Sequence, residues 1–151
     1  MGIINIVKTI KEIHKNDVAI VKIGKFYQIY GKDAYIVSYL FNYKLKEIEG
    51  VAMCGFPINS IKRVISVLEQ DKINYIILDR KNNYEVEERF DNKNLNNYLK
   101  YFKKAREYIN YKKRIENIND FMIENMNNKE FGNIIKEMEA LVNERRKVPS
   151  N

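Results

Sequence analysis

Gly-Lys-Phe-Tyr-Gln-Ile-Tyr, residues 24–30, follows an almost unbroken run of apolar and β-branched residues from Val18 to Ile23. A run of this kind is typical of a buried strand. Gly24 and Lys25 then predict a two-residue reversal, because glycine readily takes the positive φ that tight hairpin turns need. The chain is therefore expected to return from Phe26 as the second strand of a hairpin.

Side chains along that second strand alternate between two faces. Phe26, Gln28 and Tyr30 share one face, and Tyr27 and Ile29 share the other. Spacing alone favours a buried hairpin in which Phe26 is simply part of the core. The alternative is an aromatic ring and an amide that lie side by side next to a glycine turn.

Apolar periodicity predicts the other elements of the first half of the chain. Helices are expected over residues 3–14, 34–42 and 57–70, and strands over residues 51–54, 73–78 and 84–90. The connection from Tyr43 to Gly50 is polar. Together with the hairpin, these elements predict an α+β fold in which a mixed sheet is flanked by helices.

Two blocks of this region match a known pattern. Gly-x-Phe-Tyr-x-x-Tyr at residues 24–30 is closely followed by Asp33-Ala34, and Val-Ala-Met-Cys-Gly-Phe-Pro at residues 51–57 leads into a helix and a strand. In this order the blocks resemble the N-terminal mismatch-recognition domain of the MutS family of DNA mismatch repair proteins. The resemblance covers Thr9 to about Asp79, and we assign residues 1–93 to such a domain.

The resemblance implies roles for particular residues. In the MutS family the aromatic residue of the Phe-Tyr motif enters the minor groove and stacks on a mispaired base, and an acid two residues later hydrogen-bonds that base. The matching residues here are Phe26 and Gln28. Met53, in the second block, would line the same site, although a core position explains a methionine equally well.

Two residues depart from the family pattern. Gln28 replaces the usual glutamate, and Lys25 replaces a common aspartate. An amide donates as well as accepts hydrogen bonds and does not repel phosphates, and Lys25 adds positive charge. We therefore expect stronger binding to any double-stranded DNA and weaker discrimination between mismatched and paired DNA.

The sequence from Leu95 onward has a helical period throughout. It predicts a C-terminal extension, residues 94–151, with two helices at about 94–126 and 128–147. Each helix has an apolar stripe, so the two would form an antiparallel helical hairpin or bind a second copy or another protein. Basic residues dominate residues 100–114 and tyrosines are interleaved with them. Lys103, Lys104, Lys112 and Lys113 are candidate contacts to the DNA backbone, and a solvated face is the alternative explanation.

Composition limits the class of protein. A net charge of +7 makes a polyanionic partner plausible. No apolar run approaches the length of a membrane span, and no signal peptide precedes the domain, which predicts a cytoplasmic protein. Abundant Asn, Lys and Ile suggest a low-GC bacterial source. With one cysteine, Cys54, and one histidine, His14, no zinc set or internal disulfide can be assembled.

These observations predict a DNA-binding module that recognises mismatched or distorted duplex DNA without a cofactor, catalytic residue or metal. The clamp and ATPase domains of the MutS family have no counterpart in this sequence. The alternative is a protein-interaction or dimerisation module that keeps the fold but not mismatch recognition. A small nuclease ranks last, because Phe26-Tyr27 and Tyr35-Ile36-Val37 only faintly match the motif spacing of one endonuclease family.

Overall fold

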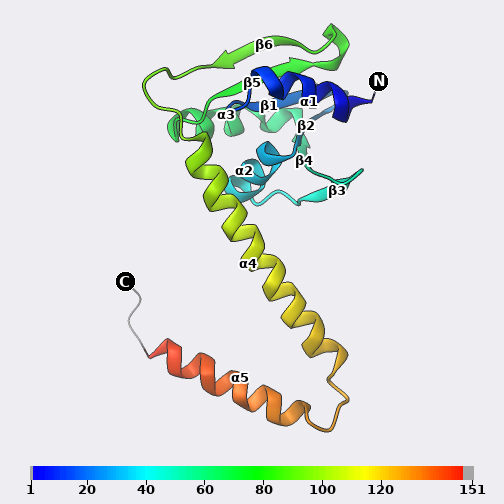
Figure 1. Ribbon diagram of the computed structural model, residues 1–151, viewed down its shortest axis with the longest axis vertical. Coiled ribbons are helices and arrows are strands. Elements are labelled where there is room, and N and C mark those ends of the chain that lie inside the picture. The colour runs from blue at the N-terminus through cyan, green and yellow to red at the C-terminus, as the bar shows by residue number, and fades with distance from the viewer. Residues whose placement is uncertain (1, 148–151) are drawn as a thin grey trace. The chain divides into compact units, whose positions relative to one another are not determined.

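A six-stranded mixed sheet forms the centre of the first part of the chain (Figure 1). The computed structural model describes residues 2–147. The strands are β1 (Val18–Ile23), β2 (Phe26–Tyr30), β3 (Lys46–Ile48), β4 (Val51–Pro57), β5 (Tyr75–Asp79) and β6 (Glu85–Phe90). Their order in the sheet is β3-β4-β2-β1-β5-β6, with β1 and β5 parallel and the other neighbours antiparallel.

Helices cover both faces of this sheet. The helices of the described residues are α1 (Ile3–Ile13), α2 (Lys32–Phe41), α3 (Ile61–Gln70), α4 (Tyr98–Glu124) and α5 (Phe131–Arg146), with short 3-10 turns η1 (Ile58–Ser60) and η2 (Arg80–Asn82). The sheet is covered by α1, α2, α3 and the start of α4. α1 packs Ile4 and Val7 onto one face. α2, α3 and the first turn of α4 pack onto the other. The predicted α+β class, a mixed sheet flanked by helices and followed by two C-terminal helices, is confirmed.

The predicted hairpin is confirmed residue by residue. Ile23 of β1 pairs with Phe26 of β2, so Gly24 and Lys25 form the reversal. Gly24 has a φ of +62°, a conformation in which a side chain would be strained. The alternation along β2 is also observed, because Tyr27 and Ile29 belong to the cluster under α2 and α3 whereas Tyr30 belongs to the cluster under α1.

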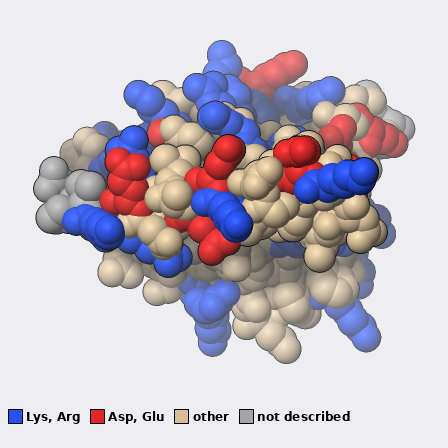
Figure 2. Space-filling model, turned by 90° about the horizontal axis from the view of Figure 1, so that it is seen from below, with Lys and Arg blue, Asp and Glu red and all other residues tan. Residues whose placement is uncertain are grey.

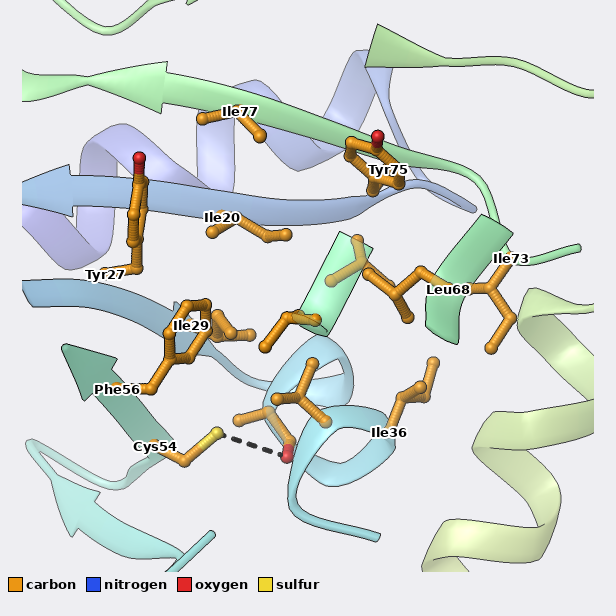
Figure 3. Close-up of a cluster of buried hydrophobic side chains, with 14 of the residues drawn as sticks. Ile20, Tyr27, Ile29, Ile36, Cys54, Phe56, Leu68, Ile73, Tyr75 and Ile77 are labelled. Atoms are coloured by element: carbon orange, nitrogen blue, oxygen red, sulfur yellow. Dashed lines mark hydrogen bonds between the residues drawn. The ribbon is translucent and has the colours of Figure 1, made fainter. Parts of the chain in front are cut away.

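The core under α2 and α3 is packed from adjacent strands (Figure 3). The rings of Tyr27 and Phe56 have centroids 5.5 Å apart. The thiol of Cys54 donates to the Ala34 carbonyl oxygen over 3.6 Å. Burial raises the pKa of this thiol to about 12, so Cys54 is neutral at physiological pH and acts as a core residue.

Asp33 has a different environment from the one expected at the start of a helix. It is 1% exposed. Its Oδ2 accepts from the Ala19 N–H over 3.0 Å, its Oδ1 lies 3.0 Å from Lys11 Nζ, and the Tyr98 hydroxyl also donates to Oδ1. Burial raises the pKa of the Asp33 carboxyl, and the three donors oppose that increase. The carboxylate thus connects α2 to β1, α1 and α4.

The two C-terminal helices begin later than the sequence pattern predicted. The side chains of asparagines before α4 accept hydrogen bonds from nearby backbone N–H groups, and these hydrogen bonds compete with helix formation. Asn92 Oδ1 accepts from the N–H groups of Asn94 and Leu95, and Asn96 Oδ1 accepts from that of Tyr98. Asn128 accepts in the same way from Glu130 N–H before α5. The strand β3 was also unpredicted, since Lys-Glu-Ile carries no clear apolar pattern.

By its internal contacts the chain divides into two units, which meet between Asn110 and Tyr111 within α4. In the second unit many apolar side chains are exposed, including Ile115, Ile118, Phe121 and Leu141. Residues 111–147 carry eight Lys and Arg side chains against seven Asp and Glu, so nearly all of the net charge of +7 belongs to the first unit. Figure 2, which looks at the end where α4 meets α5, shows the two charge types intermixed.

Candidate functional site

The ring of Phe26 projects from the sheet instead of joining the core. Phe26 is 53% exposed, whereas Tyr27, the next residue of β2, is 8% exposed. The interpretation of Phe26 as a core residue, which spacing alone favoured, is therefore wrong. Phe26 is an exposed aromatic group at the start of a strand.

The backbone that carries this ring is held on both sides. Phe26 pairs with Ile23 on β1 and with Pro57 on β4. The N–H of Ile58 donates to the Lys25 carbonyl oxygen over 3.1 Å, which ties the turn to the residue after β4. An apolar group held in this way loses little backbone entropy when it binds a partner.

Gln28 lies on the same face of β2 as Phe26 and is half-buried. The hydroxyl of Tyr30 donates a hydrogen bond to the Gln28 carbonyl oxygen, Oε1. Opposite Gln28 on β4 is Gly55, which is exposed. A Cβ at Gly55 would lie 3.0 Å from the Tyr27 carbonyl oxygen and 3.8 Å from Gln28 Cγ. A side chain at this position would press on the β2 backbone, so the glycine allows β4 to lie close to β2 beside Gln28.

Several lysines and arginines gather at the hairpin end of the sheet. Lys25 is exposed in the turn, and Lys22 precedes it on β1. β1 and β5 are parallel, and Lys22 of β1 pairs with Asp79 of β5. Arg80 and Lys81, which follow β5, therefore lie at the same end of the sheet as the β1–β2 turn. Within residues 2–147 none of these four cations takes part in an ion pair. All four lie at the same end of the sheet as Phe26, but Lys22 pairs with Tyr27 and therefore lies on the other face from Phe26.

Sequence reasoning missed Arg80 and Lys81 as candidate site residues. They lie more than fifty residues after Phe26 in the sequence and are exposed. The apolar run of residues 73–78 could have located them, because its composition is typical of a central strand in a parallel sheet. A parallel pairing of that strand with β1 would have brought its end beside the hairpin.

Met53 lies in the buried layer rather than at the surface. It is 9% exposed, pairs with Tyr30 across β2 and β4, and packs in the cluster under α1. Its side chain supports Tyr30, which in turn holds Gln28. A direct contact from Met53 to a ligand stays a prediction.

The candidate cations of α4 belong to different units. Lys103 and Lys104 lie in the first unit and Lys112 and Lys113 in the second, and all four are exposed. Basic groups stack on aromatic rings along the helix. Lys104 Nζ lies 5.3 Å from the centroid of Tyr101, Arg106 Cζ 5.8 Å from that of Phe102, and Arg114 Cζ 5.6 Å from that of Tyr111. The first two pairs form an aromatic and basic surface on the first unit.

The described residues offer little for metal or acid–base chemistry. Across residues 2–147 no group of three or more His, Cys, Asp and Glu side chains could hold a metal ion. His14 Nδ1 lies 3.1 Å from Asp17 Oδ2 at the end of α1, where the pair closes a turn. None of the described helices is long and apolar enough to cross a membrane.

A family model described as MutS domain I matches residues 1–91, which include the β1–β2 hairpin, Gln28, Arg80 and Lys81. No curated protein matches the chain.

Proposed function

Because the chain belongs to the MutS domain I family, the mismatch-recognition domain of MutS proteins, we propose that it binds mismatched or otherwise distorted duplex DNA by inserting Phe26 from the minor groove. Insertion needs no ATPase activity in this chain and no catalytic residue or cofactor. We assign this role to residues 1–93 and treat residues 94–151 as a helical extension. The protein acts in the cytoplasm of a bacterium.

The observation that carries this proposal is the exposed ring of Phe26 on a fixed backbone. Stacking an aromatic ring on a base contributes roughly 1–3 kcal/mol, and unstacking a paired step costs a few kcal/mol. The two terms nearly cancel on perfectly paired DNA. A mismatch or an unpaired base lowers the cost of opening and kinking the duplex, so insertion becomes favourable there.

Charge around the ring supports the same proposal. Lys25, Arg80 and Lys81 would contact phosphates beside the inserted ring. Lys103 and Lys104 lie on α4, whose first turn packs on the other face of the sheet, and we propose them as separate contacts to the DNA backbone. Acidic residues Glu85, Glu87 and Glu88 lie on β6, the edge strand beyond β5, and Glu85 pairs with Asp79, the residue before Arg80. DNA is therefore expected over the β1–β2 turn and the turn after β5, and not over β6 itself.

A second candidate function rests on the second unit. Its exposed apolar side chains on α4 and α5 would suit a homodimer or a protein partner. In that case the chain is an interaction module that keeps the fold without mismatch recognition. The two functions differ in salt dependence, since phosphate contacts weaken steeply as salt rises and an apolar interface does not.

The experiment that tests the proposal measures binding of the full chain to matched, single-mismatch and one-base-bulge duplexes at two salt concentrations. We expect tighter binding to the mismatched and bulged duplexes at both concentrations, because the matched duplex must first be unstacked. Equal affinity for all three duplexes, or no binding at low salt, would reject mismatch recognition. The search for function would then move to the second unit.

The cations at the hairpin end give a separate prediction. Replacing both Arg80 and Lys81 by Ala should weaken binding to every duplex and reduce the slope of log K against log salt by about 2, since each lost phosphate contact contributes about 0.9. The matched control replaces Lys44 and Lys46, which are exposed near β3 at the other end of β4. Equal slopes for the two double variants would exclude Arg80 and Lys81 from the interface.

A further inference from the structure

The hydrogen bond between Tyr30 and Gln28 has a consequence for base selection, provided that the proposed insertion of Phe26 takes place. We propose that Tyr30 holds the Gln28 amide as a hydrogen-bond donor, so that the site prefers unpaired bases whose minor-groove edge carries acceptors and no amino group. Gln28 is then the specificity-determining residue, and Tyr30 is its positioning residue.

The orientation of the amide follows from the partners of the two side chains. A glutamine amide has one acceptor oxygen and two N–H donors. The oxygen receives the Tyr30 hydroxyl proton. If the amide were turned over, its nitrogen would donate to Tyr30, and the hydroxyl proton would lose the acceptor recorded for it among residues 2–147. An unpaired hydroxyl in a buried layer is costly, so the observed orientation is favoured.

Tyr30 is well suited to hold this orientation. It is 7% exposed and packs with Val21 and Met53 in the cluster under α1, which fixes the ring. Burial raises the pKa of its phenol, so the hydroxyl keeps its proton at neutral pH and donates it to an oxygen acceptor. The Gln28 nitrogen is consequently the amide group that is available to a ligand on this face of β2.

A base stacked on Phe26 would present its edge toward the Gln28 amide. Phe26 and Gln28 share a face of β2 and are two residues apart, about 7 Å along the strand. In the minor groove all four bases present acceptors, and guanine alone adds an amino group, N2. The two N–H donors of Gln28 can hydrogen-bond to these acceptors, but they repel the guanine amino group, which is also a donor. A carboxylate at this position would instead repel the acceptors, because it has no N–H to donate.

The test compares unpaired bases that differ only by the amino group. The full chain is titrated with duplexes that carry a one-base bulge of inosine, guanine, adenine or 2,6-diaminopurine. We expect inosine to bind more tightly than guanine, and adenine more tightly than 2,6-diaminopurine, by roughly 3- to 10-fold, the range for one neutral hydrogen bond. Tyr30→Phe frees the amide to turn, so both ratios should fall toward one while binding to bulges persists.

Gln28→Met provides a second variant of similar size that has no hydrogen-bonding group, and its ratios should also fall toward one. Thermal unfolding of each variant establishes that it folds. Ratios near one in the unaltered protein, or ratios that both variants leave unchanged, would overturn the role of Gln28 and Tyr30. Failure of the proposed function has a different signature, since bulged duplexes would then bind no better than matched DNA and Phe26 would not matter.

Discussion

The Phe26→Ala protein is expected to bind a duplex with a one-base bulge no better than a matched duplex. The alanine side chain cannot stack on a base, and stacking contributes about 1–3 kcal/mol, or roughly 5- to 150-fold in affinity. Binding to matched DNA should be unchanged, because it depends on phosphate contacts from lysines and arginines that remain in place. Fluorescence anisotropy with labelled duplexes measures both affinities.

Two further variants test whether the effect depends on the aromatic ring and on this position. Phe26→Leu keeps an apolar side chain without an aromatic ring and should retain only part of the preference for bulged DNA. Ile13→Ala removes another exposed apolar group, at the end of α1, and should bind as the unaltered protein does. Since Phe26 is half exposed, its replacement should leave the unfolding temperature nearly unchanged. An Ala variant that still prefers bulged DNA would exclude insertion of Phe26.

A larger effect on stability is expected at Asp33. Replacing Asp33 by Ala leaves the Ala19 N–H, the Tyr98 hydroxyl and Lys11 Nζ without their acceptor in or near the core. Removing one partner of a buried ion pair costs about 3–5 kcal/mol. The free energy of unfolding should fall by that amount in urea denaturation, which is a large part of the stability of a small protein.

Asp33→Asn separates the loss of charge from the loss of all acceptors. Its amide oxygen can still accept from the Tyr98 hydroxyl, so its cost should be smaller than that of Asp33→Ala. Glu12→Ala removes an exposed carboxylate on α1 and is the matched control. If Asp33→Ala unfolded at the same urea concentration as Glu12→Ala, the contacts of Asp33 would contribute no net stability.

Local chemistry made the β1–β2 hairpin predictable. Gly24 supplies a positive φ, β-branched residues precede it, and alternation along β2 assigns Phe26 and Gln28 to one face. These properties depend on neighbours within a few residues. The same holds for the amphipathic helices. The helix predicted from residue 57 begins at Ile61 after the turn η1, and the start of α4 was misplaced where asparagine side chains bind nearby backbone N–H groups.

Residues far apart in the sequence decided the rest of the site. Exposure of Phe26 depends on how far α1 covers the sheet, because α1 covers Tyr30 at the other end of β2. Arg80 and Lys81 reach the hairpin through the parallel pairing of β1 with β5, which no local pattern specifies.

By itself, the sequence determined the elements, their faces, and the residue types available at the hairpin, because helical and strand periodicity and turn chemistry are local. Only the tertiary structure decided that Phe26 is exposed, that Tyr30 orients Gln28, and that Asp33 joins four elements. Those outcomes follow from which surfaces are buried together, and burial is a property of the whole chain.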